Sequence, residues 1–132
     1  MIAFILAVLL LPDPGLTPGA VTAVPQAQLC HTRWGLDRRH VTRAMRRERF
    51  RAYGIPWRAR RGYEVDHLVP RELGGADETP NLWPQRWPEA RRKDRLENWA
   101  QREVCAGRLD LEQARARITT DWAAWYHEVY GP

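Results

Sequence analysis

The middle of the chain constrains the fold most, because two short strand-like runs are followed there by a long helical pattern. The first run, Glu64–Pro70 (EVDHLVP), alternates well enough for a strand and its return, and Gly74-Gly75 supplies a turn. The second run is Asn81–Trp83, and Pro88 then stands where proline favours the start of a helix. This order predicts a small α+β unit.

Helical patterns flank this unit on both sides. Apolar residues recur at helical spacing among arginines over residues 41–53. After Pro88, the spacing predicts a helix over about 89–106 that ends at Gly107. Asp110 is a suitable cap for a further helix over about 111–129. With 132 residues in total, the chain is expected to form one mostly helical α+β domain.

The first residues have the character of an export signal. Ile2–Leu11 is an unbroken apolar run that is too short to span a bilayer but suits the apolar region of a signal peptide. Small residues at 21–23 offer a cleavage site. We therefore expect a signal peptide at 1–23, a disordered linker at 24–29 and the folded domain at 30–132. The run has no basic residue before it, so a retained N-terminal membrane anchor is the alternative.

Cys30 and Cys105 are the only cysteines. An even number in an exported chain indicates a disulfide. The bond would join the start of the domain to the end of the long helix, and closing such a loop stabilises a fold by roughly 4 kcal/mol on the chain-entropy model. Two unpaired thiols are the alternative. A zinc site that includes His31 lacks the usual ligand spacing.

The charge balance favours a polyanionic partner. Lys and Arg number 21 against 16 Asp and Glu, and Lys93 is the only lysine. Arginine donates bidentately to phosphate, whereas the alternative is a merely solvated basic surface. We expect nucleic-acid contacts from two pairs, Arg46 with Arg47 and Arg91 with Arg92. The first pair belongs to a candidate phosphate track of Arg38, Arg39, Arg43, Arg46, Arg47, Arg49 and Arg51.

Asp66 and His67 are the candidate reactive pair. An aspartate can hold a divalent cation, and an adjacent histidine can take a proton from water. Taken alone, such a pair is more often an ordinary hydrogen-bonded turn. Glu64 lies two positions before Asp66, so both side chains share one face of a strand. A role for Glu64 beside the pair and a solvent-exposed strand carboxylate are equally compatible with the sequence.

The ordered motifs resemble the HNH nuclease family, and more closely its small exported bacterial members. The resemblance covers about residues 30–125 and implies a ββα-metal core with one helix before it and one long helix after it. The matching segments are Glu64–Leu68, Leu73–Gly75, Asn81–Trp83, Lys93–Glu97 and Val104–Gly107.

The resemblance also implies roles for individual residues. Asp66 would bind the catalytic ion, His67 would be the general base, and Asn81 would brace the loop that orients the histidine. The cofactor would be one divalent metal ion, with Mg²⁺ expected first and Zn²⁺, Mn²⁺ or Ni²⁺ as alternatives.

The second metal ligand stays open between two carboxylates. Glu89 lies in the first turn of the expected helix, and Asp94 belongs to the Lys-Asp-x-x-Glu motif. Lys93 is expected to contact phosphate. Glu97 would brace Lys93 or an arginine rather than the metal.

The tryptophans at 83 and 87 have two interpretations. Trp83 and Trp87 could stack on the bases of a single strand. Packing within the domain is the favoured interpretation, because both lie beside prolines.

The predicted function is a divalent-metal-dependent endonuclease that hydrolyses DNA, in preference to RNA, with low sequence specificity. One alternative is an exported, non-catalytic, basic nucleic-acid-binding module on a degenerate HNH scaffold. Another is a phage-borne nuclease that acts inside the cell. The expected location is secreted or periplasmic, without stable membrane association after processing. The sequence identifies no immunity protein.

Overall fold

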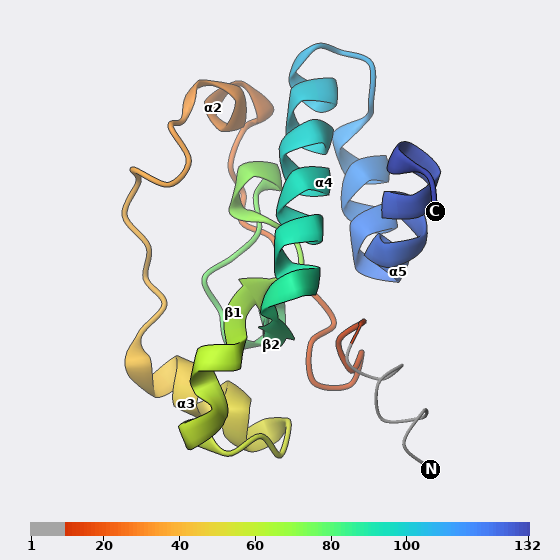
Figure 1. Cartoon of the computed structure of the whole chain (residues 1–132). Helices are drawn as coiled ribbons and strands as arrows, with labels where there is room; N and C mark the ends of the chain where they lie inside the picture. The colour runs from red at the N-terminus through yellow and green to blue at the C-terminus, as the bar shows by residue number, and fades with distance from the viewer. Residues whose placement is uncertain (1–9) are drawn as a thin grey trace.

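The computed structural model describes residues 10–132, so most of the expected apolar signal run lies outside the described residues. The fold is α+β, as predicted (Figure 1). Short 3₁₀ turns cover Trp57–Gly62, Arg71–Leu73 and Thr79–Asn81. The main elements are α2 (Gln26–His31), α3 (Arg43–Ala52), β1 (Tyr63–His67), β2 (Leu82–Arg86), α4 (Trp87–Cys105) and α5 (Leu111–Tyr130).

Strands β1 and β2 form a two-stranded antiparallel sheet. Glu64 lies opposite Gln85, and Asp66 lies opposite Trp83. Side chains alternate along a strand, so Glu64 and Asp66 project from the same face of the sheet. Helix α4 follows β2 directly, with Pro88 in its first turn. A strand, a returning strand and a helix are therefore contiguous in space (Figure 1).

Helices α4 and α5 lie side by side and enclose most of the apolar core (Figure 1). The core residues are Val69 and Leu73 after β1, Leu96, Ala100 and Val104 of α4, and Ala114, Ile118, Trp122 and Trp125 of α5. Asp121 has non-helical backbone angles, so α5 is kinked within the range over which one continuous helix was predicted. The carboxylate of Asp121 accepts a hydrogen bond from the backbone N–H of Ala124 and thereby caps the second half.

Residues 10–24, here called the N-terminal segment, lie along the domain. Ala20 accepts a backbone hydrogen bond from Ala76 at 2.9 Å, and Val21 bridges to Gly75. Trp122 donates its indole N–H to the carbonyl of Leu10 at 2.8 Å. The sequence predicted that the folded part begins near residue 30. The structure differs because backbone groups of this Pro- and Gly-rich segment pair with a distant loop, and composition does not reveal such pairing.

Helix α2 begins inside the predicted disordered linker and carries Cys30. The predicted disulfide is confirmed, because Cys30 is bonded to Cys105 with their Cα atoms 5.6 Å apart. The bond fastens α2 to the end of α4. Within residues 10–132, no helix combines the length and the apolar character needed to cross a membrane.

Candidate active site

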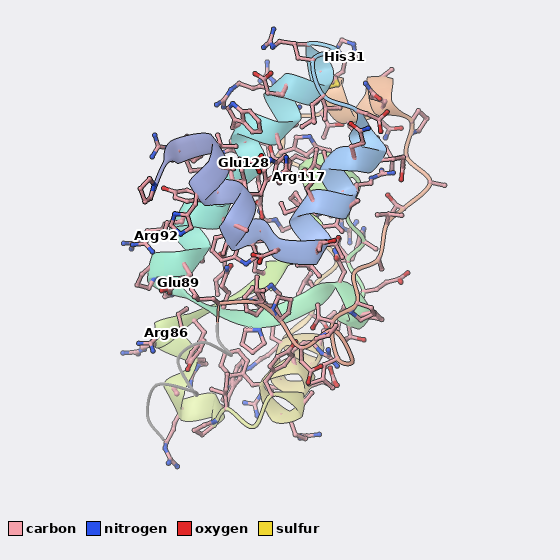
Figure 2. All side chains as sticks on the ribbon, turned by 90° about the vertical axis from the view of Figure 1, so that its right-hand side faces the viewer. His31, Arg86, Glu89, Arg92, Arg117 and Glu128 are labelled. Atoms are coloured by element: carbon pink, nitrogen blue, oxygen red, sulfur yellow. A yellow bond between two sulfur atoms is a disulfide. The ribbon has the colours of Figure 1, made fainter. Side chains whose placement is uncertain are left out.

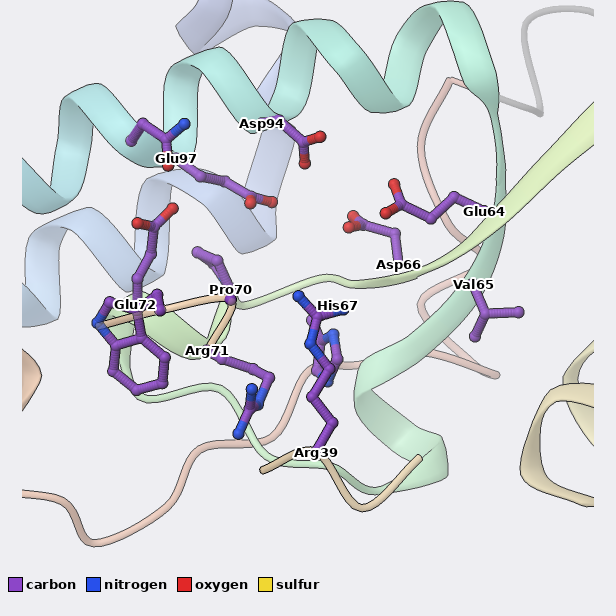
Figure 3. A pocket seen from close by; sticks show the side chains of 13 residues that line it. Arg39, Glu64, Val65, Asp66, His67, Pro70, Arg71, Glu72, Asp94 and Glu97 are labelled. Carbon is purple, nitrogen blue, oxygen red and sulfur yellow. The ribbon is translucent and has the colours of Figure 1, made fainter. Parts of the chain in front are cut away.

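A cleft of about 280 Å³ lies between β1, α4, the turn after β1 and the loop that carries Trp34 and Arg39 (Figure 3). Asp66 and His67 both line it, although neighbouring residues of a strand normally project from opposite faces. Carboxylates dominate its polar lining, since Glu64, Asp66, Glu72, Asp94 and Glu97 all face it.

Three of these carboxylates converge at one point. Oxygen atoms of Glu64, Asp66 and Asp94 lie within 4.8 Å of one another. Figure 3 shows Glu64 and Asp66 extending from the strand toward Asp94 on α4. Burial, reinforced by the charges of Asp66 and Asp94, raises the pKa of Glu64 to about 7. Burial and the charge of Asp66 also raise the pKa of Asp94. The charge of Lys93, which pairs with Asp66 and Glu97, only partly opposes these shifts, so full ionisation of Glu64 and Asp94 is unfavourable without a further cation.

The donor atoms of this group fit a hard divalent cation. Oxygen ligands from carboxylates are the ones that Mg²⁺ and similar ions take in proteins. Glu64 also has a buried Oε2 atom without a hydrogen-bond partner among the described residues. A buried polar atom that is left unpaired is costly, and a bound ion would satisfy it.

His67 ends β1 and pairs with a carboxylate from a later loop. Its Nε2 lies 2.7 Å from Oδ1 of Asp77. Burial lowers the pKa of His67, and the nearby carboxylates of Asp77 and Asp66 only partly oppose this. Burial acts to raise the pKa of Asp77, but hydrogen bonds from the His40 backbone and from His67 bring it below its ordinary value. Near neutral pH, Asp77 is therefore ionised and the imidazole of His67 is uncharged.

The charge state of Asp77 also determines which ring nitrogen of His67 is free. An ionised carboxylate can only accept hydrogen bonds, so the proton of the neutral imidazole lies on Nε2, toward Asp77. Nδ1 then keeps its lone pair and is the atom able to accept a proton. No sequence motif singled out Asp77. Its distance of ten residues from His67 gives no periodic signal.

Asn81 is fully buried and holds the loop that leaves β1. Its Oδ1 accepts a hydrogen bond from the backbone N–H of Val69 at 2.9 Å, and its Nδ2 donates to the carbonyls of Val69 and Ala76 at 3.0 Å each. At Gly75, an added Cβ would lie 1.7 Å from the carbonyl oxygen of Val69, so a side chain does not fit. These contacts determine the backbone path directly after His67.

Lys93 occupies a different place from the one expected. Its side chain is 0 % exposed, and its Nζ lies 2.7 Å from both the His67 carbonyl oxygen and Asp66 Oδ2. It also donates to Glu97 one helical turn along α4. Burial acts to lower the pKa of Lys93, but the charges of Asp66 and Glu97 raise it above the ordinary value. The predicted phosphate contact is wrong, because the ammonium group is enclosed by its partners.

Asp94, and not Glu89, joins the converging carboxylates. Glu89 lies at the first turn of α4 and does not line the cleft. Asp94 follows Lys93 and therefore lies about 100° around the helix from it, facing the cleft. Of the two alternatives that the sequence left open, the geometry favours Asp94.

The predicted basic residues divide into exposed and buried positions. Arg46 and Arg47 are exposed on α3, and Arg91 and Arg92 are exposed on α4. Figure 2 shows Arg92 and Arg86 projecting from the same side of the molecule. Arg49 does not belong to a phosphate track, because it is only 7 % exposed and pairs with Glu48 and the Leu16 carbonyl.

The chain matches no protein-family model, no curated protein and no solved structure in comparisons with each. What the cleft does must therefore be inferred from its own geometry and chemistry.

Proposed function

We propose that this protein is a divalent-metal-dependent endonuclease of the HNH type, which hydrolyses phosphodiester bonds in DNA with low sequence specificity. One observation carries the proposal. Carboxylate oxygens of Glu64, Asp66 and Asp94 lie within 4.8 Å of one another, and a buried neutral histidine lines the same cleft.

Asp66, Asp94 and Glu64 would hold the ion. Because all three offer oxygen, Mg²⁺ or Mn²⁺ suits the site better than Zn²⁺, which more often takes nitrogen or sulfur ligands. When bound, such an ion stabilises the charge that develops on a scissile phosphate and its leaving oxygen.

His67 would accept the proton of the attacking water at Nδ1. Asp77 holds the ring by Nε2, and Asn81 holds the backbone that follows it. Lys93 anchors the strand end by donating to the His67 carbonyl. The base is thus fixed from both its side chain and its main chain before substrate arrives.

Arginines at the rim would position the substrate phosphate. Arg39 lines the cleft and forms no ion pair within residues 10–132. Its guanidinium is therefore available for phosphate. Arg71 also lines the cleft but is engaged with Asp37 and Asp77. Arg71 thus supports the wall, whereas Arg39 is the candidate for substrate contact.

Export from the cytoplasm belongs to the same proposal. The disulfide between Cys30 and Cys105 is compatible with an extracellular or periplasmic location, where such bonds persist.

Plasmid nicking by the purified full chain tests the proposal. We expect cleavage with Mg²⁺ that disappears with EDTA and in the His67→Ala and Asp94→Asn variants. Glu89→Gln is the matched control, because it removes a carboxylate from the same helix outside the cleft. Cleavage that survives EDTA or His67→Ala would refute the mechanism. DNA binding without any cleavage would instead support a non-catalytic module.

A further inference from the structure

A second pocket adjoins the cleft. Its volume is about 320 Å³, and it shares Arg39, Glu64 and Val65 with the cleft. Figure 3 shows Val65 projecting away from the carboxylates of Glu64 and Asp66. The two spaces therefore meet along β1, and one bound molecule could occupy both.

Aromatic side chains form much of the wall of this pocket. Phe50 contacts Trp57 edge to face at 5.3 Å and Tyr63 at 5.8 Å between ring centroids. Trp87, at the start of α4, also lines the pocket and is 38 % exposed. Trp83, by contrast, is buried in the domain at 1 % exposure. Of the two tryptophans singled out from the sequence, only Trp87 is placed to meet a ligand.

Arginines surround the same aromatic residues. The guanidinium carbons of Arg47, Arg60 and Arg43 lie 4.9, 5.2 and 6.0 Å from the ring centroid of Trp57. Arg46 and Arg60 also line the pocket. None of these arginines forms an ion pair within the part of the chain that the structure describes. The pocket thus combines aromatic side chains with several arginines, and Glu64 is the one carboxylate among the described residues that line it.

We propose that this pocket binds an unpaired nucleobase of the strand whose phosphate lies in the neighbouring cleft. The preferred substrate would then be single-stranded DNA, or DNA that is locally unpaired. This inference rests on the proposed nuclease function of the cleft and extends it to the class of substrate. Aromatic faces that stack on bases, beside arginines that hold the backbone, are the common means of binding single strands.

The shape of the pocket argues against a duplex at this point. In a duplex, each base is stacked between its neighbours and cannot enter a side pocket unless it is first flipped out. A base that is already unpaired enters without that cost. The positive charge around Trp57 then complements the phosphates on either side of that base. This electrostatic contribution does not depend on the base sequence.

Binding of a fluorescent single-stranded oligonucleotide, measured by anisotropy in EDTA, tests the proposal without cleavage. The same oligonucleotide annealed to its complement is the comparison. We expect the full chain to bind the single strand more tightly than the duplex. Trp87→Ala should lower the single-strand affinity about tenfold, because the stacking contact with one base is lost. Trp87→Tyr should restore most of it. Duplex affinity should be unchanged by either substitution.

A pair of arginine variants separates pocket binding from general charge. Arg60→Gln and Arg102→Gln remove the same charge from exposed side chains, but Arg102 lies in the last turn of α4, whereas Trp87 of the pocket lies in the first. We expect Arg60→Gln to weaken single-strand binding several-fold more than Arg102→Gln. Equal effects of the two arginine variants would overturn the proposal. It would also fall if Trp87→Ala bound the single strand like the unmodified chain, or if duplex and single strand bound equally well.

The nicking assay distinguishes the failure of this inference from the failure of the proposed function. Mg²⁺-dependent cleavage with no effect of Trp87→Ala on binding would leave the nuclease standing and remove the base pocket. Trp87-dependent single-strand binding with no cleavage would leave the pocket standing and remove the nuclease.

Discussion

His67 can serve as a base because its neighbours determine both its charge and its tautomer. Burial keeps the pKa of the ring low, and the Asp77 carboxylate directs the proton to Nε2. We predict that Asp77→Asn reduces cleavage by about 10- to 100-fold, as loss of such a supporting partner commonly does.

The pH profile of cleavage gives a sharper readout of Asp77. Its carboxylate raises the pKa of His67, so its removal lowers that pKa further. The base must be uncharged to act, and the acidic limb of the profile should therefore move to lower pH in Asp77→Asn. Asp37→Asn is the control, because Asp37 contacts Arg71 but not His67. An acidic limb that stays in place would contradict the role given to Asp77.

The buried side chain of Lys93 has a structural role. Its single positive charge pairs with both Asp66 and Glu97 in the interior. We predict that Lys93→Met destabilises the protein by about 3–5 kcal/mol, because it leaves buried carboxylates without their cation. Urea unfolding measures the loss. Adding Glu97→Gln to Lys93→Met should recover part of it, and a double variant no more stable than the single one would contradict this account.

At the scale of elements, β1 and α4 bring like charges together. The pKa of Glu64 is raised to about 7 from an ordinary value of 4.5, first by burial and then by Asp66 and Asp94. Between pH 4.5 and about pH 7, Glu64 therefore keeps its proton in the folded chain but has lost it in the unfolded chain. Stability of the metal-free protein should therefore fall as pH rises from about 4.5 to 7.

Mg²⁺ should reverse this loss, since it binds the ionised carboxylates. Thermal unfolding at pH 5 and pH 8, with and without Mg²⁺, measures both effects. We expect Mg²⁺ to raise the melting temperature more at pH 8 than at pH 5. Glu64→Gln should reduce the pH dependence. Equal stabilisation by Mg²⁺ at both pH values, or none, would argue against an ion between β1 and α4.

The elements differ in how far the sequence predicts them. Strand β1 and helix α4 lie close to their predicted bounds, because alternation, Gly74-Gly75 and Pro88 are local signals. Strand β2 was predicted too early, since it continues through Pro84 to Arg86. The bend at Asp121 and the packing of the N-terminal segment depend on tertiary contacts. A single-sequence pattern does not carry such information.

The same distinction applies to the site. Asp66, His67 and Asn81 were recognisable because they belong to one ordered motif. Asp77 was missed because its pairing with His67 exists only after the loop between the strands folds back. Lys93 was misplaced because its helical face is set by packing against β1, and a charged residue is rarely fully buried.

At the scale of the whole molecule, the N-terminal segment closes the back of the site. Thr17 donates to the Leu82 carbonyl, and the backbone of Ala20 donates to Asn81. We predict that a chain beginning at residue 24 melts at a lower temperature than one beginning at residue 10. Faster amide exchange in the loop at residues 74–81 should accompany the change. Identical melting of the two chains would show that these contacts contribute little.

The disulfide between α2 and α4 makes the position of one wall of the cleft depend on the redox conditions around the protein. The polypeptide that follows Cys30 leads directly to Trp34 and Arg39, which form one wall of the cleft. In a reducing cytoplasm that wall would lack its covalent tether. Loss of the bond would therefore leave one wall of the cleft free to move, while β1 and α4 keep their own contacts.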